Sequence, residues 1–280
     1  MTFLRSAAAP VLMCFLVAGH TGATEVPFEI GGGIVLVKAS INGTVPLPFI
    51  LDTGATECLL TPQAANRTGL GPASGTAEKR ARSVAVGEHT VPAMSFIIHD
   101  PLQAISLRLD QGINYAGILG YPFLSKFAFS IDYQRKRLDL FDGVASGTAL
   151  KRPQAGIRVP FVLRDRLIHI AGMINGRGPV TFIVDTGSAE VLLLPQAAEK
   201  LRLPALSANR ADGIRFTTLE RISVGQATVT NVPAIIHRLH REGAGALSYD
   251  GILGYPFLSQ FKTTFNYQDK VLILEPNIAR

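Results

Sequence analysis

The chain has 280 residues, of which 47% are hydrophobic and 17% charged, and its formal net charge at pH 7 is +6. The positive charges are spread along the chain, which argues for a soluble protein and against a nucleic-acid partner. Two cysteines occur, Cys14 and Cys58. Because Cys14 lies in a segment that we expect to be removed, we expect no internal disulfide.

Residues 1–23 have the pattern of a secretory signal peptide. Arg5 supplies a positive start, Ala7 to Ala18 form an apolar run, and small residues precede an expected cleavage site after Ala23. A membrane anchor is the alternative, but the run holds only about a dozen apolar residues and contains Pro10, so it is too short and too broken to span a bilayer. We therefore expect a secreted or periplasmic protein with no stable membrane anchor after cleavage.

The sequence GILGYPFLS occurs twice, at Gly117 to Ser125 and again at Gly251 to Ser259. The similarity extends toward the N-terminus of each copy, where Ile41 to Asn66 aligns with Ile174 to Glu199 at an offset of 133 residues. A period of more than about 120 residues is too long for a solenoid unit, so each copy is predicted to be one lobe with its own hydrophobic core.

The repeat divides the remaining chain into two lobes and a connection. Residues 142–156 between the copies are rich in Gly, Ala, Ser and Pro, which is typical of a connecting segment. We expect an N-terminal lobe over residues 24–145, a linker over 146–156 and a C-terminal lobe over 157–280.

The elements of each copy follow one order. Two apolar runs flank Asn42-Gly43 and, in the second copy, Asn175-Gly176, which predicts a hairpin whose second strand ends at an Asp-Thr-Gly triplet. A short apolar strand follows, and then Thr61 before Pro62, which favours the start of a short helix. Further β-rich segments are expected at residues 82–87, 94–100, 127–133 and 137–142 and at their counterparts. The pattern predicts an all-β protein with short helices.

Each copy places one carboxylate on a tight turn directly after an apolar strand, in Asp52-Thr53-Gly54-Ala55 and in Asp185-Thr186-Gly187-Ser188. Glycine in such a turn lets backbone N–H groups approach the carboxylate. A single Asp-Thr-Gly triplet is a common surface turn. Two of them at equivalent positions, each followed by Ile-Leu-Gly, predict a functional site.

This combination resembles the aspartic proteases, specifically the retropepsin-like family, and by its duplication also the two-lobed pepsins. The resemblance covers nearly all of both halves and implies two homologous all-β acid-protease lobes related by a pseudo-two-fold axis. It implies catalytic roles for Asp52 and Asp185, with Thr53 and Thr186 bonded across the lobe interface. The catalytic loops would be supported by Thr53, Gly54, Ala55, Thr186, Gly187 and Ser188, and buttressed by Ile118, Leu119, Gly120, Ile252, Leu253 and Gly254.

The resemblance also implies the reaction, which is hydrolysis of a peptide bond by general acid–base activation of water between the two carboxyls. No metal or organic cofactor is expected, the partner is a peptide or protein substrate, and the chain would act as a monomeric pseudo-dimer. Two alternatives remain open. One is a non-catalytic peptide-binding protein that keeps the fold, and the other is a dimer in which each lobe pairs with the same lobe of a second chain.

The two loops differ at one position, because Ser188 can offer a hydroxyl to Asp185 whereas Ala55 cannot do so for Asp52. Hydrogen bonding favours the ionised form of a carboxyl. We therefore hypothesise that the substrate-free pair keeps its shared proton mainly on Asp52.

The resemblance implies a hairpin that closes over the cleft, and the candidates for it are Gly71 to Ser83 and Ala205 to Glu220; the sequence leaves open whether one, two or neither closes. Only the second has a comfortable length, with Asp212-Gly213 as its turn. His237 and His240 have a spacing that suits a metal, but no third ligand is evident, so no metal site is predicted. Cys58 lies in an apolar context and is interpreted as a core residue.

Overall fold

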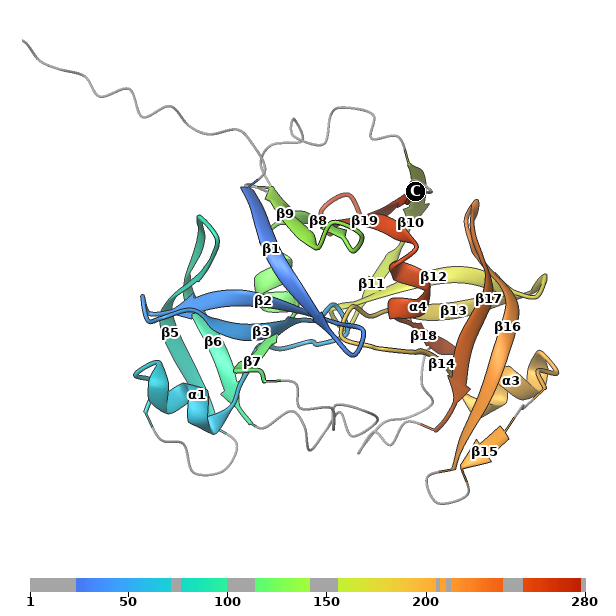
Figure 1. Cartoon of the computed structure of the whole chain (residues 1–280), viewed down its shortest axis with the longest axis horizontal. Helices are drawn as coiled ribbons and strands as arrows, with labels where there is room; N and C mark the ends of the chain where they lie inside the picture. Colours follow the sequence, from blue (N-terminus) through green and yellow to red (C-terminus); the bar gives the residue numbers. More distant parts are fainter. Residues whose placement is uncertain are drawn as a thin grey trace, which may run out of the picture.

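The computed structural model describes residues 24–71, 77–99, 114–141, 156–204, 207–209, 213–238 and 249–277. The predicted signal peptide and residues 146–155 of the predicted linker lie outside these residues. The described chain is mostly β, with short helices, and it forms two lobes that lie side by side in Figure 1. The predicted all-β fold class is confirmed.

The elements follow a similar order in both lobes, although among the described residues the second lobe has two more strands than the first. The first lobe comprises β1 (Thr24–Gly31), β2 (Ile34–Ile41), β3 (Leu47–Leu51), β4 (Leu59–Leu60), α1 (Pro62–Arg67), β5 (Ala77–Val86), β6 (His89–Ile98), β7 (Gly117–Leu119), α2 (Tyr121–Leu124), β8 (Ala128–Asp132) and β9 (Arg137–Phe141). The second comprises β10 (Ile157–Pro160), β11 (Val162–Arg164), β12 (Leu167–Ile174), β13 (Arg177–Val184), β14 (Val191–Leu193), α3 (Pro195–Lys200), β15 (Ser207–Asn209), β16 (Ile214–Val224), β17 (Ala227–Ile236), β18 (Gly251–Leu253), α4 (Tyr255–Leu258), β19 (Phe261–Asn266) and β20 (Val271–Pro276).

The predicted hairpins are present as β2–β3 and β12–β13. Their turns place Asn42 at φ 55° with Gly43 at φ 77°, and Asn175 at φ 51° with Gly176 at φ 75°. Asparagine and glycine tolerate this left-handed region, and such a turn matches the twist of the flanking strands. The Asn42 side chain also accepts a hydrogen bond from the amide of Arg82 at 2.7 Å, which ties the turn to β5.

The short helix predicted after each Asp-Thr-Gly triplet and its following strand is also present. Helix α1 begins at Pro62, and the Thr61 hydroxyl accepts a hydrogen bond from the Ala64 amide at 3.2 Å. Helix α3 begins at Pro195 in the second lobe, but Leu194 occupies the capping position there and offers no side-chain acceptor. No helix among the described residues is long and apolar enough to cross a membrane.

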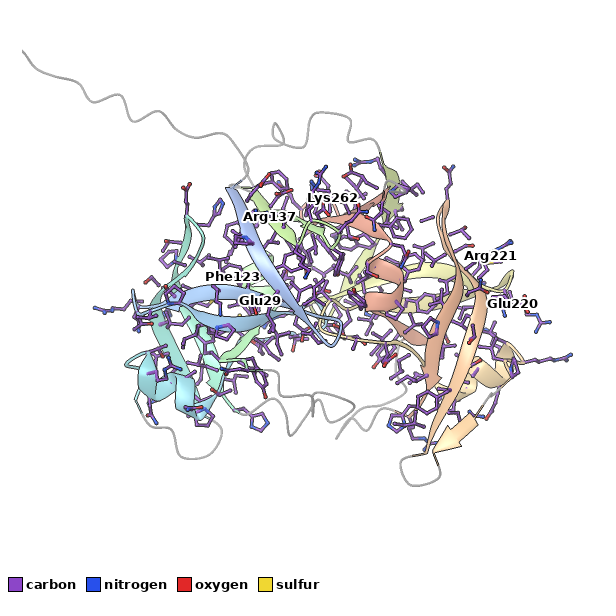
Figure 2. All side chains as sticks on the ribbon, in the orientation of Figure 1. Glu29, Phe123, Arg137, Glu220, Arg221 and Lys262 are labelled. Atoms are coloured by element: carbon purple, nitrogen blue, oxygen red, sulfur yellow. The ribbon has the colours of Figure 1, made fainter. Side chains whose placement is uncertain are left out.

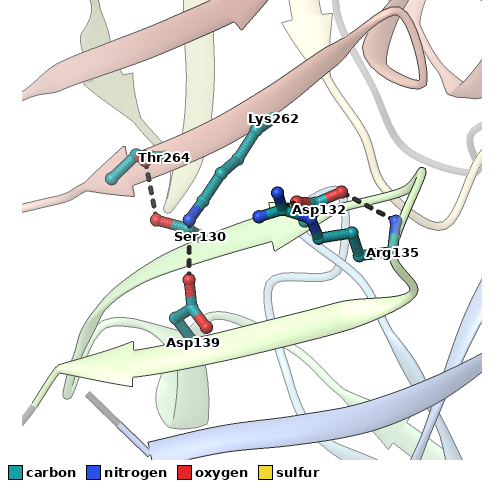
Figure 3. A network of polar contacts seen from close by, with 6 residues as sticks. All are labelled: Ser130, Asp132, Arg135, Asp139, Lys262 and Thr264. Carbon is teal, nitrogen blue, oxygen red and sulfur yellow. Dashed lines mark hydrogen bonds and ion pairs between the residues drawn. The ribbon is translucent and has the colours of Figure 1, made fainter. Parts of the chain in front are cut away.

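The lobes are joined by six strands in the order β10-β20-β19-β8-β9-β1, which we call the interlobe sheet. At its centre Ser130 of β8 pairs with Thr264 of β19, and their hydroxyl oxygens lie 2.7 Å apart (Figure 3). These two residues are equivalent positions of the sequence repeat. A residue that pairs with its own equivalent lies on the symmetry axis, so the pseudo-two-fold axis passes between them.

Polar and aromatic contacts hold the centre of the interlobe sheet. Phe129 stacks on Phe265 of the other lobe with ring centroids 4.7 Å apart. Lys262 of β19 donates to Asp139 of β9 at 2.9 Å, which is a second cross-lobe contact (Figure 3). Each contact joins the first half of the chain to the second.

The hydrophobic core differs from the prediction of one core for each lobe. Buried side chains of both lobes belong to one continuous cluster, which includes Phe49 and Phe182 from the two lobe sheets and Phe129 and Phe265 from the interlobe sheet. The prediction was wrong because β8 and β19 pair with each other across the lobe boundary, and their inner faces join the two cores. The two lobes are therefore expected to fold as one cooperative unit.

We expect Phe129→Ala to lower the free energy of unfolding by about 3–5 kcal/mol, because it removes a fully buried ring at the lobe boundary. Met173→Ala is the control, since Met173 is exposed and its loss should change stability by less than about 0.5 kcal/mol. Urea unfolding measures both values. An equal stability of the two variants would contradict the structural role of this contact.

Candidate active site

Each aspartate of the repeat leaves the end of a strand in the middle of its lobe. Asp52 follows β3, and its amide donates to the carbonyl of Leu119 in β7 at 3.1 Å. Asp185 follows β13, and its amide donates to the carbonyl of Leu253 in β18 at the same distance. Strands β3 and β13 run parallel to β7 and β18 respectively. Both carboxyls therefore begin from backbone that is hydrogen-bonded into a sheet.

The two Asp-Thr-Gly loops meet across the lobe boundary. A Cβ atom added at Gly54 would lie 2.4 Å from Cγ of Asp185, and one added at Gly187 would lie 2.5 Å from Cγ of Asp52. No side chain fits at these distances, so glycine is required at both positions. Within each loop the glycine amide also donates to its own aspartate, from Gly54 to Asp52 and from Gly187 to Asp185, both at 2.7 Å. The structure thus brings the predicted pair of carboxyls together.

The two threonines of the loops form a reciprocal set of hydrogen bonds. The hydroxyl of Thr53 donates to the carbonyl of Val184 at 2.8 Å, and that of Thr186 donates to the carbonyl of Leu51 at 2.6 Å. Each hydroxyl also accepts from the backbone amide of the other threonine at 3.1 Å. All four bonds cross the lobe boundary and are buried, so they hold the loops in one register.

The Ile-Leu-Gly triplets lie behind the loops, and their three residues make different contacts. Gly120 is so close to the loop that an added Cβ would lie 2.2 Å from the carbonyl oxygen of Glu57, and Gly254 meets Glu190 at the same distance. Leu119 and Leu253 pack in the continuous core. The isoleucines face the other side of the sheet, where Ile118 and Ile252 join smaller apolar clusters.

Burial sets the electrostatics of the pair. It raises the pKa of Asp52 well above the ordinary value of an aspartic acid, and the charge of Asp185 raises that pKa further. Burial likewise raises the pKa of Asp185, against hydrogen bonds that lower it. Two carboxyls this close cannot both ionise easily, so the titration belongs to the pair.

The hypothesis about Ser188 is wrong in its reason. The Ser188 hydroxyl donates to the carbonyl of Glu190 at 2.9 Å and accepts from the amide of Glu190 at 3.5 Å, so it is engaged within its own turn. Burial supplies a different asymmetry, because Asp52 is 7% exposed whereas Asp185 is only half-buried. The more buried carboxyl is the costlier one to ionise. A proton on Asp52 thus stays a prediction, on this other ground.

The lobes make a further contact beside the loops, and this contact does not follow the symmetry of the repeat. Arg166, in the turn between β11 and β12, donates to the carbonyl of Thr56 at 3.1 Å and forms an ion pair with Glu57. The equivalent position of the first lobe is Gly33, which instead lies against Ala189 of the second lobe. Sequence alignment of the copies shows this difference, but the cross-lobe contact became visible only in three dimensions.

Two further residues escaped the sequence analysis. Tyr133 and Tyr267 are equivalent positions that follow β8 and β19, and each packs edge-to-face on a tyrosine of the other lobe, Tyr255 and Tyr121, at centroid distances of 5.7 and 5.4 Å. Burial raises the pKa of both phenols, and the charges of the aspartates raise it further. All four tyrosines recur at equivalent positions of the two copies, and this recurrence could have identified them from the sequence.

The segments expected to close over the cleft belong in part to the lobe sheets. Residues 77–83 lie in β5, which pairs with β6 along its length and with β2 at Val84 and Ala85. In the second lobe β15 and β16 form a hairpin in which Asn209 pairs with Ile214, and β15 is the last strand of its sheet. Figure 1 shows β5 at the left side of the first lobe and β15 at the bottom of the second. Residues 72–76 and Asp212 lie outside the described residues.

The remaining candidates from the sequence are His237, His240 and Cys58. Among the described residues no group of three or more His, Cys, Asp or Glu side chains could hold a metal ion, and His240 lies outside those residues. Burial raises the pKa of Cys58 to about 11, and its sulfur lies 3.9 Å from that of Met94. Such a thiol is not a nucleophile at neutral pH.

Paired Asp-Thr-Gly loops at the boundary of two β lobes define the aspartic protease fold. A family model described as "Aspartyl protease" matches residues 37–123 and 170–257, so the chain belongs to this family. The solved aspartic proteinase from Irpex lacteus is similar in structure, with a TM-score of 0.58 and 16% sequence identity over 91% of this chain and 97% of that one. No curated protein sequence matches the chain significantly.

We expect Thr186→Val to lower the free energy of unfolding by about 2–4 kcal/mol, because it leaves the buried amide of Thr53 and the buried carbonyl of Leu51 without their partner. Thr228→Val is the matched control, since the Thr228 hydroxyl is exposed and bonds only Ser223 among the contacts observed. Urea unfolding compares the two variants. Equal losses would show that the cross-lobe bonds add nothing to stability.

The raised pKa values predict how stability depends on pH. The folded state binds protons to the pair more tightly than the unfolded chain, whose aspartates titrate near 4, so the pair costs stability as pH rises from about 4 through the folded-state pKa values. Asp52→Asn cannot ionise and should gain stability relative to the parent over that range. Unfolding titrations at a series of pH values measure this difference, and a difference independent of pH would contradict the assigned shift.

Proposed function

We propose that this protein is an aspartic endopeptidase that hydrolyses peptide bonds with Asp52 and Asp185 as its catalytic pair. One observation carries the proposal: each carboxyl lies against the glycine of the opposite loop, so the two groups lie next to each other at the lobe boundary. The raised pKa of both groups supports a single shared proton.

The shared proton gives the pair an acid and a base at once. The ionised carboxyl takes a proton from a water molecule, whose oxygen attacks the carbonyl carbon of the substrate, while the protonated carboxyl donates to the carbonyl oxygen. The first carboxyl then gives its proton to the amide nitrogen as the C–N bond breaks. The second carboxyl takes a proton back from a hydroxyl of the tetrahedral intermediate, which becomes the product carboxylic acid. The pair ends with one proton, as it began, and no covalent intermediate forms with the enzyme.

The surroundings favour this chemistry because they hold the carboxyls still. The reciprocal bonds of Thr53 and Thr186 fix the relative position of the loops, and the Gly54 and Gly187 amides point at the carboxylates. Groups that are already oriented need little rearrangement when charge develops in the transition state. Activity should require one proton on the pair, and it should fall both when the pair gains a second proton and when it loses the first.

The same proposal covers the state and place in which the protein works. It acts as a monomer, because both aspartates come from one chain and the interlobe sheet joins the lobes. Its substrate is a peptide or a protein. The pattern of residues 1–23 supports export, with removal of that segment and release into the periplasm or the medium.

Cleavage of a peptide library across pH tests the proposal, with Asp52→Asn and Asp185→Asn as variants. We expect both to lose at least about a hundredfold in kcat/KM, because neither can supply the acid and the base together. Thr228→Val serves as a control that keeps the parent activity. Binding of peptides without cleavage by the parent would favour a non-catalytic peptide-binding protein, and full activity in either asparagine variant would refute the catalytic pair.

A further inference from the structure

Each lobe has one row of three paired side chains on equivalent strands, and the two rows differ in chemistry. In the first lobe Glu29, Leu36 and Ile50 are register partners across β1, β2 and β3. In the second lobe the equivalent partners across β11, β12 and β13 are Val162, His169 and Ile183. We call these the first and second wall rows. The alignment of the repeat places His169 where the first lobe has Leu36.

Both rows lie on the sheet face from which the aspartates emerge. Side chains alternate between the faces of a strand, so Ile50 shares a face with Asp52, and Ile183 shares one with Asp185. Register partners in an antiparallel pair also share a face. Leu36 and His169 therefore point to the same side of their sheets as the carboxyls do, away from the continuous core.

The first wall row borders the space between the lobes. Leu36 and Ile50 belong to a small apolar cluster that also contains Tyr115 and, from the second lobe, Ala189. A residue of the opposite lobe in this cluster places it at the lobe boundary. The row reaches solvent at Glu29, which is exposed on β1 and labelled in Figure 2.

The second wall row is apolar at its ends and polar in its middle. Ile183 packs in a cluster with Leu167 and Tyr249, while Val162 at the outer end is 53% exposed. Between them His169 is 6% exposed and lies edge-to-face with Tyr249, at a centroid distance of 6.4 Å. In the first lobe the corresponding polar residue is the outermost one, and the middle is aliphatic.

The His169 ring has an unmet hydrogen-bonding group. Its Nδ1 atom is buried and has no hydrogen-bond partner. Burial and the charge of Arg164 lower the pKa of His169, so the ring is neutral at neutral pH and offers one donor and one acceptor. A buried polar atom without a partner costs free energy, and a site that leaves one unpaired is suited to a ligand that supplies the bond.

We propose that His169 selects the substrate side chain that lies against the second lobe, favouring one that is uncharged and hydrogen-bonding, such as that of Gln, Asn or Thr. The first lobe, with Leu36 at the equivalent place, selects an aliphatic or aromatic side chain. The inference rests on the proposed peptidase function and adds a preferred direction of the bound peptide to it. The two sides of the scissile bond are read by different chemistry, although the dyad between them is nearly symmetric.

The test uses one peptide scaffold in which Leu or Gln occupies each of the two positions that flank the cleaved bond. On the side read by the second lobe, the parent should cleave the Gln peptide well. His169→Leu, which copies the first lobe, should lower kcat/KM for that peptide about tenfold, the effect of one lost hydrogen bond, and leave the Leu peptide within about twofold. His169→Gln should restore part of the loss, because the amide keeps a donor and an acceptor.

Leu36→His is the mirror experiment. It should create tolerance for Gln at the position on the other side of the cleaved bond, which also assigns each lobe to a side. Thr228→Val is the control, since the Thr228 hydroxyl is exposed and lies outside the wall rows, and it should leave the ratio of Gln to Leu cleavage unchanged. Unfolding measurements on each variant confirm that the fold is kept.

The outcomes separate the two levels of the proposal. If the parent cleaves the peptides and His169→Leu keeps the same ratio of Gln to Leu cleavage, the role of His169 is refuted and the peptidase function stands. If the parent cleaves no peptide at any pH, the peptidase function fails and the selection by His169 fails with it.

Discussion

The close approach of two carboxyls across the lobe boundary is the constraint on which the rest of the structure depends. Bringing Asp52 and Asp185 together out of water costs free energy, and it raises the pKa of both groups. The surrounding chain offsets that cost with glycine amides aimed at the carboxylates and with reciprocal threonine bonds. The interlobe sheet carries the same symmetry further, since its axis passes between Ser130 and Thr264.

Duplication explains how one chain builds such a site, and divergence of the copies explains why it is not fully symmetric. The residues that touch the carboxyls are nearly the same in both halves. The residues one step away differ: Arg166 replaces Gly33 at the lobe contact, and His169 replaces Leu36 in the wall row. A peptide has a direction, so the two sides of its cleaved bond present different groups. For the proposed peptidase, divergence in this outer layer would let the lobes read those groups separately without disturbing the pair.

Local chemistry accounts for the features that sequence analysis predicted well. Asn42-Gly43 requires a left-handed turn, and Thr61 before Pro62 starts a helix, because both depend only on neighbouring residues. The prediction for Ser188 failed because a hydroxyl can reach several acceptors, and the carbonyl of Glu190 lies two residues away in the same turn. The prediction of separate cores failed because the pairing of β8 with β19 leaves no local signal. The unpartnered nitrogen of His169 likewise depends on contacts from three strands.

The sequence by itself determined the duplication, the all-β class and the two Asp-Thr-Gly loops, since these follow from repeated letters, apolar periodicity and turn residues. Only the tertiary structure decided that the loops meet, that the lobes share one core, and that β15 ends its sheet. The physical reason is the range of the interactions. Turns and caps are formed by residues close in the chain, whereas the proximity of Asp52 to Asp185 arises from strand pairing between residues more than a hundred positions apart, which no short segment encodes.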